Sequence, residues 1–335
     1  MRYVILGSNS FSGSHLMDEL LSNQDNSVYG ISRSPEKSAL YLPYKARADR
    51  GNYEFRQCNI VHEFEKLVRM LDVIQPECII NYAALTEVYQ SHQTPVEYFE
   101  TNTMAMVKLC HELSLGTQHL RQKYLKCYIH ISSAEVYGSC EKPVDESTPP
   151  HPTTPYAVSK ATADDYLTTL FKHSGFPVII IRSTNVYGKH QQLYKIIPRT
   201  VIKLMQGKKI ELHDGGNFVR PFIHVTDAAR GVIAAIERGK PGNIYNFSTE
   251  CNLSIEEVVK LICQKMGKDF ESSTVSVEER TGHDRRYWLD YSKANKKLAW
   301  YPFIPFERGL DEVISWIEDN WEEVLKEPQS YIHKV

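Results

Sequence analysis

The sequence has no long apolar segment and almost no net charge. Its longest aliphatic runs, such as residues 178–181, are far shorter than the ~20 apolar residues of a membrane-spanning helix. The 39 Lys and Arg residues against 41 Asp and Glu residues give a formal charge of -2, so no basic surface for nucleic acid or an anionic membrane is expected. Membrane proteins and DNA-binding proteins are therefore poor explanations for this chain.

Paired cysteine motifs and metal-ligand spacings are also missing. The 7 cysteines include no Cys-x-x-Cys pair, and several stand in apolar runs where small buried thiols are common. We therefore expect reduced, structural cysteines in a cytoplasmic protein without a signal peptide. The 13 histidines include no pair at a ligand spacing with a third ligand, so no metal is predicted.

The chain does have a regular alternation of short apolar runs and amphipathic stretches, and 42% of its 335 residues are hydrophobic. Near-continuous apolar strands separated by helices are typical of a parallel sheet buried on both faces. The sequence predicts an α/β fold, a Rossmann-type doubly wound parallel sheet with a smaller interleaved α/β substrate-binding domain. Strands are expected at 3–6, 27–31, 54–57, 78–81, 127–132 and 177–182, and helices at about 12–23, 61–74, 95–115 and 156–172.

Past residue 185 glycine and proline punctuate shorter segments, which indicates a second domain. A helix is expected at 227–237, a strand at 244–247, and amphipathic helices at 253–266 and about 305–326. The expected division places residues 1–184 plus about 220–248 in the sheet domain. The smaller domain takes about 185–219 plus 249–335.

The expected helix at 95–115 carries apolar residues at three- and four-residue steps, including Val96, Met106, Cys110 and Leu113. This spacing places them on one face of the helix, where another helix packs. The seam serves either the core of the same chain or a subunit interface.

The first expected strand runs into Gly7-Ser8-Asn9-Ser10-Phe11-Ser12-Gly13, and a helical pattern follows. Dinucleotide-binding folds need small residues at this junction for a tight turn, for close approach of the pyrophosphate and for close helix–strand packing. The first turn of the helix offers free N–H groups to phosphate. We therefore predict a dinucleotide site here, rather than an ordinary strand–helix turn.

The end of the second expected strand indicates which dinucleotide binds. An acidic residue there accepts hydrogen bonds from the ribose hydroxyls of NAD, but this chain has Ser32-Arg33-Ser34. A guanidinium flanked by hydroxyls suits the 2′-phosphate of NADP, because its planar fork pairs with phosphate. NADP is preferred over NAD on this basis, and a solvated loop charge at Arg33 is the alternative.

Tyr156 and Lys160 stand at i and i+4 on an expected helix, on the same face as Leu167. A free tyrosine is a poor base at neutral pH, and a lysine one turn away together with an oxidised nicotinamide would lower the pKa of the phenol. The phenolate then removes the proton of a substrate hydroxyl as hydride leaves the carbon. Ser133, at the end of an expected strand, can hold the same hydroxyl.

With these residues the chain resembles the extended short-chain dehydrogenase/reductase family, in the NAD(P)-dependent epimerase/dehydratase branch that acts on nucleotide-diphosphate sugars. The stretches at 195–198 and 282–287 look most like nucleotide-sugar 4,6-dehydratases of the dTDP-glucose 4,6-dehydratase type. The resemblance covers essentially the whole chain. It rests on residues 7–13, 81–84, 100–102, 132–138, 155–160, 185–188, 195–198, 220–225, 245–246 and 282–287.

The resemblance implies a catalytic set of Ser133, Glu135, Tyr156 and Lys160, with Glu135 removing the C5 proton after oxidation at C4. Water then leaves C6 and hydride returns there, giving a 4-keto-6-deoxy sugar and a recycled, tightly bound cofactor. The expected cofactor-binding residues are Gly7, Ser10, Phe11, Gly13, Ser32, Arg33, Ser34, Asn59, Ile60, Ala83, Ala84, Tyr156 and Lys160.

One position departs from the dehydratase pattern. The acid that would protonate the departing C6 hydroxyl is replaced by Ala134, and a methyl group donates no proton. Glu135 acting as both base and acid, or a water molecule, would still allow dehydration. Epimerisation, C4 oxidation or decarboxylation are the alternatives, and a structural carboxylate at Glu135 or a non-catalytic nucleotide-sensing protein are more remote ones.

The second domain must supply cations for a substrate diphosphate. The resemblance implies a substrate site of Thr86, Asn185, Lys195, Arg220, Arg285 and Arg286, with Arg220 in a loop before a strand and His283 orienting a loop. Neither the nucleotide nor the hexose can be read from the residues. In the family, helices such as those at about 95–115 and 156–172 form dimers, so a homodimer is expected.

Overall fold

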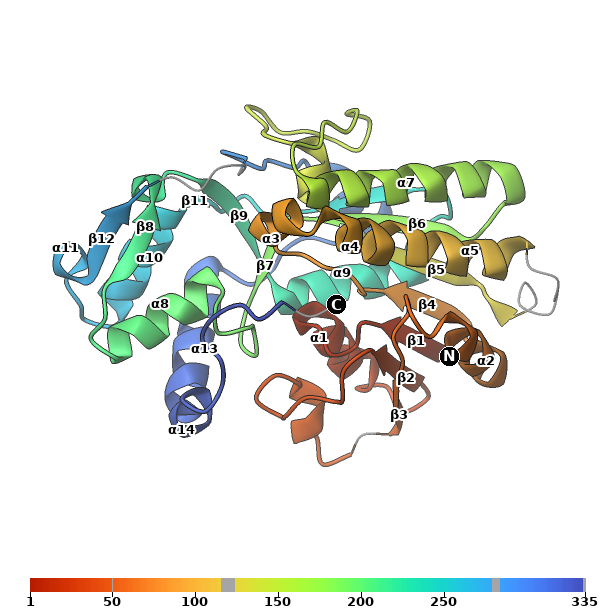
Figure 1. Ribbon diagram of the computed structural model, residues 1–335, viewed down its shortest axis with the longest axis horizontal. Helices are drawn as coiled ribbons and strands as arrows, with labels where there is room; N and C mark the ends of the chain where they lie inside the picture. The colour runs from red at the N-terminus through yellow and green to blue at the C-terminus, as the bar shows by residue number, and fades with distance from the viewer. Residues whose placement is uncertain (50, 116–123, 279–283, 334–335) are drawn as a thin grey trace.

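The computed structural model describes residues 1–49, 51–115, 124–278 and 284–333 (Figure 1). Its centre is a seven-stranded sheet in the order β10-β6-β5-β4-β1-β2-β3, in which every neighbouring pair is parallel. This order confirms the doubly wound sheet. The strands are β1 (Arg2–Leu6), β2 (Ser27–Ser32), β3 (Asn52–Gln57), β4 (Cys78–Asn81), β5 (Cys127–Ile131), β6 (Val178–Ser183) and β10 (Ile244–Phe247).

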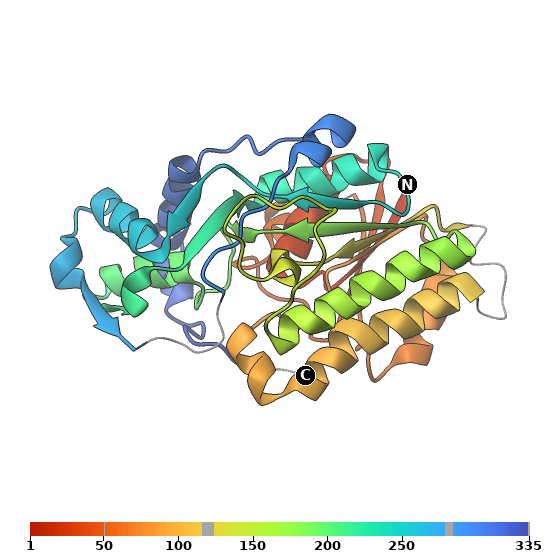
Figure 2. The same cartoon turned by 90° about the horizontal axis from the view of Figure 1, so that it is seen from above.

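The middle strands are buried along nearly their whole length because helices cover both faces of the sheet. All four residues of β4 and the last four of β1 are buried, which explains why the runs in the sequence are continuously apolar instead of alternating. One face carries α1 (Phe11–Leu20), α9 (Val225–Arg238) and α12 (Ser292–Leu298). The other carries α2 (Phe64–Ile74), α5 (Ala105–Leu115) and α7 (Pro155–Ser174), and Figure 2 shows α5 and α7 side by side.

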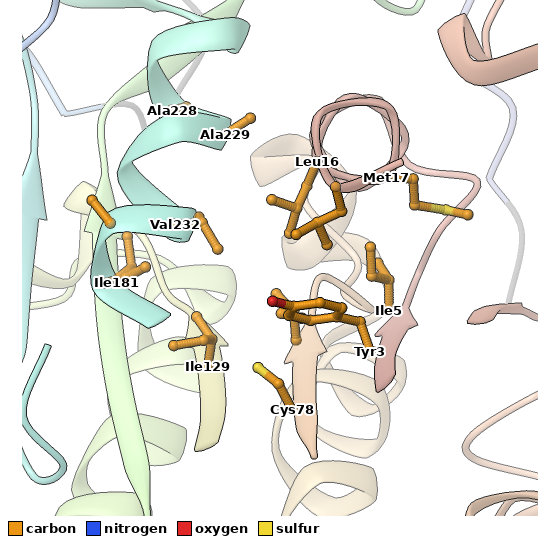
Figure 3. Packing of buried hydrophobic residues seen from close by; sticks show 14 of the residues in the cluster. Tyr3, Ile5, Leu16, Met17, Cys78, Ile129, Ile181, Ala228, Ala229 and Val232 are labelled. Atoms are coloured by element: carbon orange, nitrogen blue, oxygen red, sulfur yellow. The ribbon is translucent and has the colours of Figure 1, made fainter. Parts of the chain in front are cut away.

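The face under α1 and α9 forms the larger core of this layer (Figure 3). Leu16 of α1 and Val232 of α9 point toward the sheet, where they pack in one cluster with Ile5, Ile129 and Ile181. Residues from five elements far apart in the sequence thus share one core, and this core joins the phosphate-loop helix to the second half of the chain.

The helix expected at 95–115 is divided into α4 (Pro95–Phe99), a π-helical turn (Glu100–Met104) and α5. Met106, Cys110 and Leu113 are buried in the core between α2, α5 and α7, whereas Val96 is 67% exposed. The apolar seam is therefore core packing within the chain. Its buried positions give no evidence about a subunit interface, and the expected homodimer stays a prediction.

The remaining elements build a smaller body beside the sheet (Figure 1). Its core contains Val201, Ile262, Val313 and Ile317. β11-β9-β7 and β12-β8 form its two small sheets. The elements are β7 (Asn185–Tyr187), α8 (Ile196–Met205), β8 (Ile210–His213), β9 (Val219–His224), β11 (Asn252–Ser254), α10 (Ile255–Lys265), α11 (Phe270–Ser273), β12 (Thr274–Val277), α13 (Phe306–Asp319) and α14 (Trp321–Val324). The short helix α3 (Val88–Gln93) instead packs against α4 and α7 of the large domain.

The chain crosses between the two bodies more than once. α9 and β10 return to the large sheet after β9 has joined the three-stranded sheet. We therefore propose that the chain forms two interleaved domains, divided as the sequence predicts. Across the described part of the chain, no helix combines the length and apolarity needed to cross a bilayer.

Six of the seven cysteines are buried, and Cys251 is half-buried. These positions agree with thiols that act as small packing groups.

Candidate functional site

The junction of β1 and α1 has the geometry of a phosphate-binding loop. Gly7 has φ +80°, and a Cβ there would lie 2.7 Å from the backbone nitrogen of Ala83. Ser10 caps α1 by accepting a hydrogen bond from Gly13 N (3.1 Å). A Cβ on Gly13 would lie 2.7 Å from the carbonyl oxygen of Gly7. Both glycines are therefore needed, one for its conformation and for close approach to β4, and the other for helix–loop packing.

The loop after β2 is tied to this phosphate loop. Asn9 Nδ2 donates to the carbonyl oxygens of Ser34 (3.1 Å) and Pro35 (2.8 Å). Asn9 N donates to Ser32 Oγ (2.9 Å). These bonds fix the backbone on either side of Arg33. The Arg33 side chain therefore extends from a rigid segment beside the phosphate-binding loop.

A cavity of about 330 Å³ runs along the carboxyl ends of the strands. Its lining brings together most of the residues predicted to hold a dinucleotide: Gly7, Ser10, Ser32, Arg33, Ser34, Asn59, Ile60, Ala83 and Ala84. Thr86, expected in the substrate site, lines it as well. Phe11, Gly13, Tyr156 and Lys160 do not line it: Gly13 lies beneath the loop, and Tyr156 packs behind Leu85.

The C-terminal segment also lines this cavity, which no motif in the sequence indicated. Residues 327–328 and 330–332 contribute to its lining, and Figure 1 shows the C-terminal segment running from α14 back toward the large sheet. The ring of Tyr331 lies 5.4 Å from that of Tyr194, and its hydroxyl lies 2.9 Å from His333 Nδ1. His333 Nε2 lies 2.6 Å from Glu97 Oε2 on α4. The tail thus connects the smaller domain to the large one across the front of the cavity.

Ser133 and Tyr156 lie together where β5 ends and α7 begins. Ser133 begins a short 3-10 turn (Ala134–Tyr137) and accepts a hydrogen bond from Glu135 N (3.2 Å). Thr154 caps α7, and Tyr156, Lys160 and Leu167 are all buried, as their common helix face predicts.

Burial, Glu135 and Ser133 all act on the pKa of the Tyr156 phenol. Burial raises the pKa of the phenol above its ordinary value, and the charge of Glu135 adds to the rise, while a hydrogen bond with Ser133 partly offsets it. The expected lowering needs an oxidised nicotinamide as well as Lys160 and stays a prediction, and in the structure Lys160 Nζ donates to the carbonyl oxygen of Ile131 (2.6 Å). Lys160 Nζ also lies 3.4 Å from His130 Nε2.

Lys160 sits in a buried polar network. Burial lowers the pKa of its ammonium group to about 8, and the charge of Asp164 partly restores it. Burial also holds the pKa of His130 well below its usual range, so this imidazole is neutral at pH 7. A lysine with a pKa near neutrality can both lend charge to a nearby phenolate and exchange a proton.

Glu135 is half-buried, and its Oε2 atom is buried without a hydrogen-bond partner among the described residues. Burial raises the pKa of this carboxyl to about 7; Arg220 and Lys195 lower it and Asp284 raises it. A carboxyl with a pKa close to the working pH exchanges protons readily in both directions, which a general acid–base requires. Glu135 therefore differs from a carboxylate that caps a backbone N–H.

Arg220 and Lys195 approach Glu135 from the smaller domain. Arg220 lies within β9, not in a loop before it, and donates to the carbonyl oxygens of Asp284 (2.8 Å) and Arg285 (3.2 Å). Lys195 forms an ion pair with Glu87. Both cations thus already have protein partners within the chain.

The other expected substrate residues are more open. Asn185 and Arg285 are exposed, and the guanidinium of Arg286 lies 3.8 Å from the ring centroid of Trp288. Gly282 and His283 lie outside the described residues. No three His, Cys, Asp or Glu side chains are grouped as metal ligands within the described ranges, and the absence of a metal from the reaction stays a prediction.

The loop after β4 is fixed by a residue of the quoted motif 100–102. Asn102 Oδ1 accepts from Leu85 N (2.8 Å), and its Nδ2 donates to Leu85 O and Ser159 Oγ (both 3.0 Å). Asn102 therefore connects the cavity wall to α7, which carries Tyr156. The sequence quoted this residue without indicating its positioning role.

The chain matches the NAD dependent epimerase/dehydratase family over residues 3–248. It is 30% identical to the dTDP-D-glucose 4,6-dehydratase of Homo sapiens over 97% of this chain and 93% of that protein. It is 29% identical to the dTDP-glucose 4,6-dehydratase of Haemophilus influenzae, over 94% and 97% respectively. Among solved structures, DesIV, a dTDP-glucose 4,6-dehydratase from Streptomyces venezuelae with NAD bound, aligns with a TM-score of 0.87 at 29% identity, covering 96% of this chain and 98% of that one.

Proposed function

Because this chain belongs to the NAD dependent epimerase/dehydratase family, we propose that it catalyses the 4,6-dehydration of a nucleotide-diphosphate hexose. The observation that carries the proposal is Glu135, a half-buried carboxyl with a pKa of about 7 beside Ser133 and Tyr156. The two curated dehydratases and DesIV, each matched over more than nine-tenths of this chain, support the same reaction class. A plain C4 oxidoreductase has no use for a carboxyl tuned in this way.

The cavity fits a nicotinamide dinucleotide. Gly7 and Gly13 leave room that a Cβ would fill, the first turn of α1 presents N–H groups, and Ser10, Asn59 and Ala83 line the space beyond. When bound, the dinucleotide supplies a hydride acceptor for C4 of the sugar and the hydride donor for C6.

The protein groups then divide the proton transfers. Ser133 holds the C4 hydroxyl and Tyr156 removes its proton, for which the phenol pKa must fall. Lys160 lies one turn away on α7, and release of its Nζ from the Ile131 carbonyl would let its charge reach the phenol. Glu135 removes the C5 proton, which the new C4 ketone has made acidic.

Elimination follows at C6. The C5–H electrons form the C5=C6 double bond as the C6–O bond breaks, and the oxygen must gain a proton to leave as water. With Ala134 in place of an acid, the proton that Glu135 has just taken is the nearest one available. Its pKa near 7 makes this return thermodynamically easy, and Glu135 then takes a proton from solvent and delivers it to C5 as hydride adds at C6.

The finer cofactor preference rests on Arg33. This side chain lines the cavity at the end of β2, where no carboxylate stands to bind the ribose hydroxyls. We infer a preference for NADP, although DesIV was solved with NAD bound. A homodimer through the helices at about 95–115 and 156–172 is also proposed, on the resemblance alone, and sedimentation analysis tests it.

An epimerase is the second candidate, favoured by the methyl group at Ala134, since C5 deprotonation without an acid at C6 ends in reprotonation. The test is mass spectrometry of products from GDP-, UDP-, dTDP- and CDP-hexoses in heavy water with NAD or NADP. Loss of one water with gain of one deuterium is expected. Deuterium gain without water loss would make the protein an epimerase, and loss of two hydrogens alone would make it a C4 oxidase.

A further inference from the structure

A segment of the smaller domain packs beside the 3-10 turn Ala134–Tyr137 of the large domain. This turn contains Glu135 and is called the catalytic turn below. Residues 284–290 run beside residues 138–146, which follow Glu135 in the chain. Arg285 N donates to Ser139 Oγ (2.8 Å), and Cys140 N donates to the carbonyl oxygen of Arg286 (2.9 Å). An isolated bridge joins Val144 to Leu289. The segment is thus held at several points along its length.

Tyr287 enters the small core beneath the catalytic turn. It belongs to the same buried cluster as Ala134, Val136 and Ala161, and only 3% of it is exposed. Tyr287 of the smaller domain therefore packs in the same core as Ala134, which stands where the dehydratase pattern has an acid. A longer acidic side chain at position 134 would have to compete with this cluster for space.

Tyr287 packs against Ala134 and Val136, the two chain neighbours of Glu135, and its hydroxyl bonds to one carboxyl group and acts on the pKa of a second. It donates to Asp284 Oδ2 (3.3 Å), and hydrogen bonding with the same hydroxyl lowers the pKa of Glu135. Asp284 is itself fixed, since Thr153 Oγ1 donates to its Oδ1 (2.9 Å). The guanidinium of Arg220 lies 4.4 Å from the Tyr287 ring centroid.

We propose that Tyr287 and Asp284 are positioning residues that hold Glu135 for both proton transfers and so compensate for the acid lost at Ala134. The inference rests on the proposed dehydration. Tyr287 donates to Glu135 in its ionised form, when the carboxylate must face C5. Asp284 retains the phenol once Glu135 is protonated, so that the carboxylic acid is free to turn its proton toward the C6 oxygen.

Tyr287 and Asp284 change the pKa of Glu135 in opposite directions. Arg220 on β9 and Lys195 before α8 lower its pKa, Asp284 raises it, and the Tyr287 hydroxyl lowers it. Tyr156 on α7 faces the same carboxyl. Loss of the Tyr287 hydroxyl should therefore raise the pKa of Glu135, and neutralising Asp284 should lower it.

The experiment compares Tyr287→Phe and Asp284→Asn with the wild-type enzyme in single-turnover reactions from pH 5 to 9. Absorbance of the reduced nicotinamide reports C4 oxidation, and mass spectrometry reports deuterium at C5 and water loss. Oxidation should stay within about twofold of wild type, whereas water loss should slow ~10- to 100-fold. The acid limb of the water-loss profile should move to higher pH in Tyr287→Phe and to lower pH in Asp284→Asn.

Tyr291→Phe is the matched control, because this tyrosine follows the same segment but its ring packs 6.1 Å from that of Trp300. Thermal unfolding monitors whether each variant is folded. Equal slowing of oxidation and water loss, or limbs that do not move in opposite directions, would overturn the inference while leaving dehydration intact. If the wild type exchanges C5 hydrogen without losing water, the proposed function fails instead, and the exchange profile of the same variants still tests the positioning role.

Discussion

Arg182 and Asp164 form a buried ion pair, and the charge of Asp164 acts on the pKa of Lys160. Arg182 Nε lies 2.9 Å from Asp164 Oδ2, and the two side chains are 3% and 1% exposed. Asp164→Ala leaves the guanidinium buried without its counter-charge, so the free energy of unfolding should fall by about 3–5 kcal/mol. Urea unfolding measures this, and Asp165→Ala, at the exposed neighbouring position on α7, should change it by less than about 0.5 kcal/mol.

Tyr156→Phe should abolish the proton transfer at C4. We expect turnover to fall by about 10²–10⁴-fold without a matching loss of cofactor binding, because the phenol is buried behind Leu85 and does not line the dinucleotide cavity. The control is Tyr166→Phe, on the same helix, where the hydroxyl only donates weakly to the carbonyl oxygen of Val107 (3.5 Å). Full activity in Tyr156→Phe would contradict the catalytic scheme.

Glu135 should make the stability of the protein depend on pH. Its pKa rises from an ordinary 4.5 to about 7 on folding, so the folded state binds more protons than the unfolded chain between these values. The stability present below pH 4.5 is therefore lost as the pH rises through 7. Glu135→Gln should be inactive, yet more stable than wild type by about 1–3 kcal/mol at pH 8 and equal to it at pH 4. Denaturant unfolding at the two pH values checks the sign.

Arg33 should decide between the two dinucleotides. Arg33→Ala should raise the Kd of NADP by about 10- to 100-fold and that of NAD by less than twofold, because only NADP carries the 2′-phosphate. Titration calorimetry measures both. Arg56→Ala removes a guanidinium of β3 that pairs with Glu54 and should affect neither. Equal weakening of both cofactors would assign Arg33 a general role in shaping the cavity.

The C-terminal tail should slow the release of the cofactor. His333 joins the tail to Glu97, and Tyr331 lines the cavity beside Tyr194. Removal of residues 329–335 should increase the dissociation rate of the dinucleotide by about tenfold or more, while the rate of C4 oxidation under saturating cofactor stays close to that of the full chain. Stopped-flow displacement measures the release, and Glu97→Gln should have a smaller effect in the same direction. An unchanged dissociation rate would show that the tail only packs against the domain.

The local patterns of the chain determined its architecture and most of the lining of the cavity proposed to hold the cofactor. Continuous apolar runs can be buried on both faces only in a parallel sheet, and a strand–glycine loop–helix junction leads to one kind of turn, so short-range chemistry was sufficient for both. The same reasoning located Ser133, Tyr156 and Lys160, because the end of a strand and one helix face are local features.

The tertiary structure decided what depends on residues distant in sequence. The direction of the Tyr156 pKa follows from burial and from Glu135, and Lys160 donates to a backbone carbonyl of β5. Tyr287 and Asp284 approach Glu135 only because the smaller domain folds back over the catalytic turn. Burial and Coulomb interactions between distant segments depend on tertiary packing. They cannot be predicted from the spacing of residues along the chain.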